Sequence, residues 1–307
     1  MLPAVDTVLT GLALGLAGLW GLRAAAHALI LKGLRAPRVT ASTLPEALGL
    51  VAQAVSIAGP NGKTLFAWFV PVSGASKTPA VLVMHGWGAN AGMMLPSVAP
   101  LVDAGLAVLL LDARCHGASG DETFTSLPRF AQDIDAGLDW LARQAQVDAD
   151  RLALIGHSVG AGAALLSATR RDDIRAVVSI SAFAHPYEVM RRLLAANHIP
   201  YFGIGWYVLR HVQRVIGARF DDIAPIRSVT RVRCPVLLVH GEDDDMVPFD
   251  DALRLLAAGQ NGRVQLLALP GRHDPTEALQ TESPQLLAFL ISSLGRRPQT
   301  PAGAAGD

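Results

Sequence analysis

Short apolar runs that each end in a glycine-rich or acidic loop constrain the fold of this chain more than any other feature. They occupy residues 80–84, 107–111, 152–155 and 236–239, and residues 264–269 are apolar except for Gln265. Uninterrupted apolar runs of this length are typical of strands buried on both faces of a sheet. Segments with the spacing of an amphipathic helix alternate with them, as in residues 130–144. This alternation predicts an α/β fold with a mostly parallel, doubly wound sheet and helices on both faces.

The 307 residues are sufficient for one large α/β domain, which we expect to cover residues 41–295. Residues 1–40 read as a hydrophobic helix and a connector. Residues 185–225 interrupt the alternation, because they are helical in pattern and hold all three tyrosines. We expect them to form a small helical lid over the site. Residues 296–307 are predicted to be a disordered tail.

The N-terminal segment is apolar enough to enter a membrane. Val8–Leu22 carries no charge, and residues 8–31 are long enough to cross a bilayer if Arg23 lies near a helix end. Asp6 precedes the run, whereas the basic residues Arg23, Lys32, Arg35 and Arg38 accompany or follow its end. This asymmetry predicts a single-pass anchor with the catalytic domain on the cytoplasmic side.

Two other interpretations of the N-terminal segment stay open. The small residues 24–28 could be the cleavage site of a secretory signal, which would make the protein secreted or periplasmic. The segment could also be a buried or surface-lying amphipathic helix. Gly11 and Gly15 form a G-x-x-x-G pattern, but in so glycine-rich a run it predicts no oligomeric state.

The run 152–155 leads into "GHSVG", in which Ser158 stands between Gly156 and Gly160. A helix-forming, alanine-rich stretch follows directly. A serine at such a strand-to-helix turn is held in a strained backbone conformation, and its neighbours must be small. The alternative is a glycine-rich helix start that serine merely caps.

A serine hydroxyl needs a base to take its proton and a carboxylate to orient that base. His273 follows the run 264–269, and Asp243, Asp244 and Asp245 follow the run 236–239. Because the carboxyl ends of parallel strands share one edge of a sheet, we expect these groups to meet near Ser158. The chain order is serine, aspartate, histidine.

On these motifs the chain resembles the α/β-hydrolase superfamily of serine hydrolases over residues 55–294. The motifs are "HGWG" (85–88), "DARCHGAS" (112–119), "GHSVG" (156–160), "HGEDDDMVP" (240–248) and "GRH" (271–273). The resemblance places the acid at Asp244, with Asp243 and Asp245 as alternatives, and the oxyanion hole at the N–H groups of Trp87 and Val159. Cys115 departs from the glycine common at its position in this superfamily, which questions the backbone angle there.

The expected function is hydrolysis of a carboxylic ester of apolar or lipid-like character, through an acyl-enzyme formed on Ser158. A thioesterase or a proline-releasing serine peptidase would use the same triad. A catalytically idle binding protein with a hydrolase fold is a further alternative. A haloalkane dehalogenase is disfavoured, because its nucleophile is an aspartate.

Other site chemistries have little support in the sequence. The formal net charge is zero, so no nucleic-acid partner is expected. No ligand spacing for a metal and no nucleotide-binding loop is present, and we expect no cofactor. The two cysteines form no disulfide framework. His85, His116 and His240 are expected to shape loops, and His157 is expected to point away from the substrate. His185, His198 and His211 are expected to lie on the surface.

Overall fold

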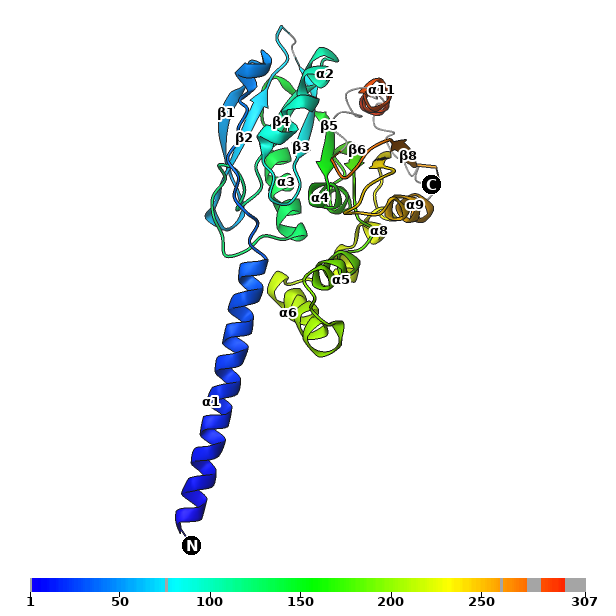
Figure 1. Ribbon diagram of the computed structural model, residues 1–307. Coiled ribbons are helices and arrows are strands. Elements are labelled where there is room, and N and C mark those ends of the chain that lie inside the picture. The colour runs from blue at the N-terminus through cyan, green and yellow to red at the C-terminus, as the bar shows by residue number, and fades with distance from the viewer. Residues whose placement is uncertain (1, 75–76, 260–261, 275–282, 296–307) are drawn as a thin grey trace, which may run out of the picture.

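The computed structural model describes residues 2–74, 77–259, 262–274 and 283–295, and within them eight strands form one sheet (Figure 1). The order across the sheet is β1-β2-β4-β3-β5-β6-β7-β8. Strands β1 and β2 run antiparallel to their neighbours, and β3 to β8 are mutually parallel. The strands are β1 (Gln53–Ala58), β2 (Thr64–Val70), β3 (Thr78–Met84), β4 (Ala107–Leu111), β5 (Val147–His157), β6 (Ile174–Ile180), β7 (Val236–Gly241) and β8 (Val264–Leu269).

Helices cover both faces of this sheet. The α-helices are α1 (Leu2–Gly33), α2 (Val98–Asp103), α3 (Leu127–Ala142), α4 (Val159–Ala168), α5 (Pro186–Ala196), α6 (Trp206–Ile216), α7 (Phe220–Ile223), α8 (Pro225–Ser228), α9 (Phe249–Ala258) and α11 (Ser283–Leu294). Short 3-10 turns occupy Pro45–Leu48, Pro60–Gly62 and Ala91–Ser97, and a π-turn occupies Tyr201–Gly205. The sequence analysis does not anticipate α2 or α9.

Strand β3 shows why the apolar runs are continuous. Ala80, Leu82 and Met84 enter the core layer with α3 and α4, while Val81 and Val83 enter the layer with α2 and α11. Successive side chains of a strand point to opposite faces, so a strand covered on both sides needs apolar residues at every position. The predicted mostly parallel, doubly wound α/β fold is thereby confirmed.

Helix α1 projects from the domain as one long, straight rod (Figure 1). Its Thr7–Gly33 stretch has 27 residues and a mean hydropathy of 1.5, with none of the apolar window buried in the protein. At the helical rise this stretch is about 40 Å long, enough to cross a bilayer core. Signal sequences near an N-terminus satisfy the same criterion of length and composition.

The domain end of α1 is fastened to the body. Ile30 and Leu34 are buried in the main core layer, and the Leu34 carbonyl accepts a hydrogen bond from the Thr125 N–H. Arg38 donates to the carbonyls of Gly117 and Ser119, at 2.6 and 2.9 Å. The connector is therefore held against the loop that follows β4.

We term the helices α5 to α8 the helical insertion (residues 186–228). In the chain they follow β6 and precede β7, and they lie beyond the carboxyl edge of the sheet (Figure 1). The expectation that His211 lies on the surface is wrong, because its side chain contacts His27 of α1 and stacks on Tyr207. His198 is exposed and His185 is half-buried. The predicted tail at 296–307 lies outside the described residues.

Candidate active site

Ser158 stands at the sharp turn between β5 and α4. Its backbone has φ 53° and ψ −116°, a conformation that L-residues rarely adopt. The Ser158 N–H donates to the Ile180 carbonyl at 2.8 Å, which ties the turn to the end of β6. The serine is therefore fixed at the carboxyl edge of the sheet by its backbone, independently of its side chain.

The two glycines of the motif are required by close backbone packing at this turn. A Cβ on Gly156 would lie 2.3 Å from the Gly160 carbonyl oxygen, and a Cβ on Gly160 would lie 2.3 Å from that of His85. Neither neighbour is a flexible side chain that could move aside. This steric requirement distinguishes the turn from a helix start that serine simply caps; indeed, the Ser158 side chain makes no capping hydrogen bond.

The loops after β7 and β8 bring two further groups to Ser158. His273 Nε2 lies 3.0 Å from Ser158 Oγ, and His273 Nδ1 lies 2.8 Å from Asp244 Oδ2. Because the carboxylate only accepts hydrogen bonds, it fixes the tautomer with the proton on Nδ1. Nε2 is then free to accept the serine proton. The arrangement is a chain of hydrogen bonds from a buried carboxylate to a serine hydroxyl.

Among the three consecutive aspartates, Asp244 is the one that contacts His273. Its other oxygen accepts the N–H groups of Met246 and Val247, at 2.9 and 2.8 Å. Asp245 instead pairs with Arg272 in an exposed ion pair, and Asp243 is exposed. Asp244 is therefore the candidate acid that the geometry supports.

The surroundings of Asp244 keep it ionised. Burial works against the charge, but hydrogen bonds from His240, His273 and the Val247 N–H outweigh burial and hold the pKa of this carboxyl well below its usual range. An ionised Asp244 is the form that can orient His273 and stabilise a positive charge on its ring.

Two histidines outside the predicted triad support it from behind. His240 Nε2 lies 2.9 Å from the Val247 carbonyl oxygen and 3.3 Å from Asp244 Oδ2, so it braces the turn that carries the acid. The neutral His157 ring donates from Nε2 to the His273 carbonyl at 2.9 Å, with burial lowering the pKa of His157. The sequence analysis gives His240 a loop role and expects His157 to point away from the substrate. It predicts neither contact, because a hydrogen bond to a backbone carbonyl leaves no sequence motif.

Of the two predicted oxyanion donors, Val159 follows Ser158 directly in the chain, and Trp87 belongs to the loop after β3. Val159 is the first residue of α4, where backbone N–H groups lack partners within the helix. A Cβ on Gly86 would lie 3.2 Å from Ser158 Cβ, so the backbone that leads into Trp87 passes directly beside the serine. The Trp87 side chain is itself 37% exposed.

Behind this loop, His85 and His116 form a buried layer with Phe130. The Ala113 N–H donates to His85 Nε2, and the Gly88 N–H donates to His116 Nε2, each at 3.1 Å. Burial lowers the pKa of each histidine to about 4. Both rings are therefore neutral acceptors at neutral pH and hold the loop around Trp87 in place.

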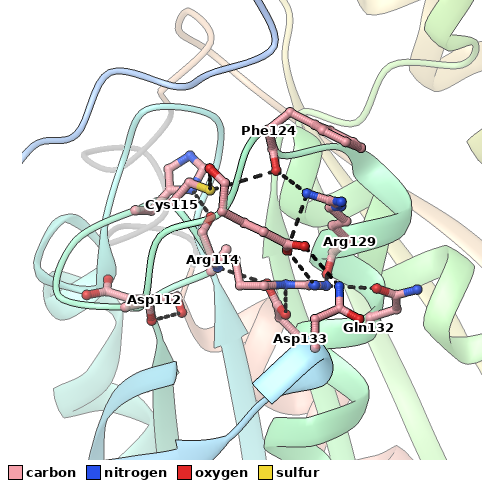
Figure 2. Close-up of polar contacts among 12 residues, drawn as sticks. Asp112, Arg114, Cys115, Phe124, Arg129, Gln132 and Asp133 are labelled. Carbon is pink, nitrogen blue, oxygen red and sulfur yellow. Dashed lines mark hydrogen bonds and ion pairs between the residues drawn. The ribbon is translucent and has the colours of Figure 1, made fainter. Parts of the chain in front are cut away.

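The loop after β4 is anchored by a buried arginine (Figure 2). Arg114 pairs through Nε with Asp133 Oδ1 at 2.7 Å, and both side chains are fully buried. Its remaining nitrogens reach Glu122, Gln132 and the Arg129 carbonyl, at 3.0, 2.8 and 3.1 Å. One guanidinium thus joins this loop to helix α3.

Cys115, next in the chain, has φ 66°, in the left-handed region that glycine adopts most easily. The thiol contacts the carbonyl oxygens of Glu122 and Phe124 (Figure 2). The backbone angle questioned from the sequence is therefore the glycine-like one, held by a cysteine. Asp112 accepts the N–H groups of Ala91 and Ala118, at 2.7 and 2.8 Å, and braces the same loop.

An open groove of about 1160 Å³ lies elsewhere, between α5, α6 and α7. It is lined by polar and charged residues of the helical insertion, and Ser158, Asp244 and His273 do not line it. We therefore place the candidate chemistry at the serine. Among the described residues, no group of three or more His, Cys, Asp or Glu side chains could hold a metal.

Comparison with known proteins gives consistent similarities. Residues 97–275 match the prolyl oligopeptidase family. An uncharacterized protein of Mycobacterium tuberculosis is 32% identical over 217 residues, which are 70% of each chain. The α/β-hydrolase domain-containing protein WAV2 of Arabidopsis thaliana is 25% identical over 76% of this chain and 75% of its own.

Two solved structures share the fold. The esterase Pf2001 of Pyrococcus furiosus superposes with a TM-score of 0.69 at 22% identity, covering 85% of this chain and 98% of its own. Est1E of Butyrivibrio proteoclasticus, solved with ferulic acid bound, gives 0.64 at 23% identity, covering 79% and 100%. At these identities the likeness concerns the fold.

Proposed function

Because the chain belongs to the prolyl oligopeptidase family and is a hydrolase of the α/β-hydrolase type, we propose that it cleaves carboxylic esters with Ser158 as nucleophile. The observation that carries the proposal is the chain of hydrogen bonds from Asp244 through His273 to Ser158. The strained backbone at Ser158 supports it, because rare conformations of this kind gather at reacting groups.

In the first half of the reaction, Ser158 Oγ attacks the ester carbonyl carbon while His273 Nε2 takes the hydroxyl proton. The resulting tetrahedral intermediate collapses to an acyl-serine, and the alcohol leaves with the proton from His273. In the second half, His273 takes a proton from water, the hydroxide attacks the acyl carbon, and Ser158 recovers its proton as the acid departs. Asp244 stays ionised throughout and orients the imidazole.

We assign the oxyanion hole to the N–H groups of Val159 and Trp87. Each donor is worth about 3–4 kcal/mol when it is aimed at the oxygen that gains charge. The Val159 N–H lies at the N-terminus of α4, where the helix dipole favours negative charge. The buried pair His85 and His116 keeps the Trp87 loop rigid enough for this purpose.

The proposed substrate is a small-molecule ester with an apolar acyl or alcohol part. The helical insertion contributes Tyr187, Tyr201 and several aliphatic side chains to the apolar layer beyond the sheet edge. The similar folds of proteins named as esterases favour an ester over other acyl compounds. A thioester would be cleaved by the same steps.

A second candidate substrate is a proline-containing peptide, which the family match over residues 97–275 favours. The two candidates share nucleophile and base, so substrate comparison separates them. Release of an amine from a prolyl amide faster than release of p-nitrophenol from the best ester would favour the peptidase.

The test combines covalent labelling with a series of p-nitrophenyl esters of rising acyl length. We expect a fluorophosphonate to label the protein and rates to rise with acyl length. Ser158→Ala should abolish labelling and lower kcat at least about a thousandfold. Asp244→Asn should lower kcat by up to about ten-thousandfold.

Ser292→Ala is the control, because Ser292 donates only to the Phe289 carbonyl in α11. It should leave labelling and rates unchanged. Persistent labelling and ester cleavage by Ser158→Ala would reject the proposed nucleophile. An absence of labelling in folded wild-type protein would favour the idle binding protein.

We further propose that α1 anchors the protein in a membrane as a single span, with the catalytic domain on the cytoplasmic side. Its exposed apolar side chains, among them Leu12, Leu16 and Trp20, support this placement. Basic residues gather at its domain end, as the cytoplasmic flank of a span requires.

A further inference from the structure

The helical insertion carries an exposed apolar segment between α5 and α6, which we term the apolar loop (Phe202–Trp206). The side chain of Phe202 is 90% exposed, that of Ile204 59% and that of Trp206 54%. Gly203 has φ 78°, and the turn it makes directs these side chains outward instead of into the core. An exposed cluster of large apolar side chains on one short segment marks an interaction surface.

The depth of this loop relative to a bilayer follows from α1. A bilayer core of roughly 30 Å takes about 20 helical residues, so a span that starts near Thr7 ends close to His27. His27 Nδ1 lies 2.8 Å from His211 Nε2 of α6. Helix α6 and the apolar loop that leads into it therefore lie at the level of the lipid headgroups.

The chemistry around the loop suits that level. The Arg191 guanidinium lies 4.6 Å from the centre of the Tyr201 ring, and that of Arg210 lies 5.6 Å from the Trp206 ring. Both arginines are exposed. Aromatic rings beside arginines are typical of the interface of a membrane, where the rings enter the boundary and the cations meet anionic headgroups.

The link between α1 and the domain fixes which face is turned to the bilayer. Leu34 is buried, Arg35 Nε donates to the Thr123 carbonyl at 3.1 Å, and Arg38 holds the loop after β4. With the connector held in this way, α1 and the helical insertion point to the same side of the domain (Figure 1). The carboxyl edge that holds Ser158 faces that side, since β6 leads from Ile180 beside Ser158 into α5.

We propose that the apolar loop inserts into the interface of the same bilayer that holds α1. The loop is thus a second membrane contact, beside the helix. Resting on the esterase function proposed above, this contact also specifies the substrate class: an amphiphilic ester that resides in the bilayer and reaches Ser158 from the membrane side, past the helical insertion.

The insertion itself is tested by fluorescence, which does not depend on activity. The full-length protein is reconstituted in vesicles of phosphatidylcholine and phosphatidylglycerol, with or without bromine on the acyl chains. Bromine quenches tryptophans that reach the acyl region, and Trp20 and Trp206 are the two largely exposed ones, at 73% and 54%. We expect Trp20→Phe to retain quenching and Trp20→Phe/Trp206→Phe to lose it.

Equal quenching in these two variants would overturn the proposal, because Trp206 would then lie outside the lipid. Protection of Trp206 from a soluble quencher without bromolipid quenching would also overturn it, and would assign the loop to a protein partner. Failure of α1 to insert is recognised separately, since bromolipid would then not quench the Trp20 fluorescence of the Trp206→Phe variant.

The consequence for substrate is tested by Phe202→Ser/Ile204→Ser, with Val51→Ser as a matched control. Val51 is 80% exposed and lies before β1, away from the helical insertion. We expect the double variant to cleave a long-chain ester in vesicles about tenfold more slowly, as the loss of two interfacial apolar contacts implies. Cleavage of soluble p-nitrophenyl acetate should stay within about twofold.

If the double variant lost the same factor in rate on both substrates, the loop would have a role in folding or catalysis and the proposed substrate route would be overturned. If its rate on the ester in vesicles were unchanged, the loop would not be part of the route by which substrate reaches Ser158. If the wild type cleaves neither ester, the esterase proposal fails and the fluorescence result alone decides the membrane contact.

Discussion

At the scale of single residues, the site depends on which groups carry charge. Asp244 is held ionised by the hydrogen bonds it accepts, whereas His85 and His116 are held neutral by burial. Nε2 of His85 accepts a hydrogen bond from the Ala113 N–H, and Nε2 of His116 accepts one from the Gly88 N–H. If either ring gained a proton on Nε2, two donors would face each other and that hydrogen bond would be lost. The loop around Trp87 therefore requires both rings to be uncharged.

This requirement makes stability depend on pH. The pKa of His116 is about 4 in the folded protein, below its unfolded value of 6.5, so its contribution is complete above pH 6.5 and is lost as pH falls towards 4. His116→Gln keeps an acceptor near the Nε2 position but cannot titrate. We expect the decrease in unfolding free energy between pH 7 and 4.5 to be about 2 kcal/mol smaller in the variant than in the wild type.

Denaturant unfolding of both proteins at the two pH values measures this difference. Titrating groups away from His116 are the same in both proteins, so their contributions cancel, whereas Asp112 and His85 interact with His116 and belong to the measured difference. An identical pH dependence would show that His116 is not held neutral.

The residues of the triad could be predicted from the sequence, but the residues that hold the triad in place could not. Ser158, Asp244 and His273 stand in a recognisable order after three strands, and the structure joins them by hydrogen bonds; their catalytic roles stay predictions. His240 and His157 could not be assigned, because each acts on a backbone carbonyl that only the folded loops bring near.

At the scale of elements, the loop after β4 connects three parts of the molecule. Arg38 of the connector donates to it, its own Arg114 pairs with Asp133 of α3, and its His116 accepts a hydrogen bond from Gly88 in the Trp87 loop. Arg114 is the centre of this arrangement, since its side chain is fully buried beside Asp133 (Figure 2). A buried arginine that pairs with Asp133 and donates to Glu122, Gln132 and the Arg129 carbonyl fixes the loop on α3.

We expect Arg114→Met to lower the unfolding free energy by about 3–5 kcal/mol, because Asp133 would be left buried without its partner. Arg233→Met is the control: Arg233 pairs with Asp172 on the surface, where both side chains are largely exposed. That variant should change stability by less than about 1 kcal/mol.

Chemical denaturation measures both variants. Adding Asp133→Leu to Arg114→Met should recover part of the loss, because it removes the unpaired carboxylate. Equal effects of Arg114→Met and Arg233→Met would contradict a structural role for the buried pair.

The elements themselves were predictable where packing leaves a pattern. The apolar runs of strands β3 to β7 are buried on both faces, and this continuous apolar character reveals them. The edge strand β8 is mostly half-buried or exposed, and its run is interrupted by Gln265. The six-residue helix α2 is too short to show a helical period. Helix α9 directly follows the acidic loop that contains Asp244, and its own first turn is acidic as well, so its start does not stand out from the loop. The contact between α6 and α1 was not predictable, because it joins residues 184 positions apart.

At the scale of the whole molecule, the protein consists of a hydrolase domain and a long helix that adds little to its core. The apolar window of α1 is unburied. The core contacts are made by Ile30 and Leu31 in its last turn and by Leu34 directly after the helix. Stability of the domain and attachment to a membrane should therefore be separable by truncation.

We expect a chain without residues 2–26 to unfold with a free energy within about 1 kcal/mol of the full-length value, since His27, Ile30 and Leu34 remain. It should sediment with membranes far less than the full-length chain, because only the apolar loop (Phe202–Trp206) is left to contact the bilayer. A chain without residues 2–38 should be clearly less stable, because it also loses Leu34 and Arg38. Thermal unfolding in detergent and a vesicle sedimentation assay measure the two properties. Sedimentation of the chain without residues 2–26 to the same extent as the full-length chain would contradict anchoring by α1.

Residues 34–38 are held against the loop after β4 by hydrogen bonds, so no flexible linker separates helix α1 from the domain. With α1 in a membrane as we propose, an enzyme joined to it in this way cannot tumble freely above the bilayer and meets its substrates by diffusion within a plane. Its turnover should then follow the mole fraction of substrate among the lipids, while dilution of the vesicles in buffer leaves the rate per enzyme unchanged.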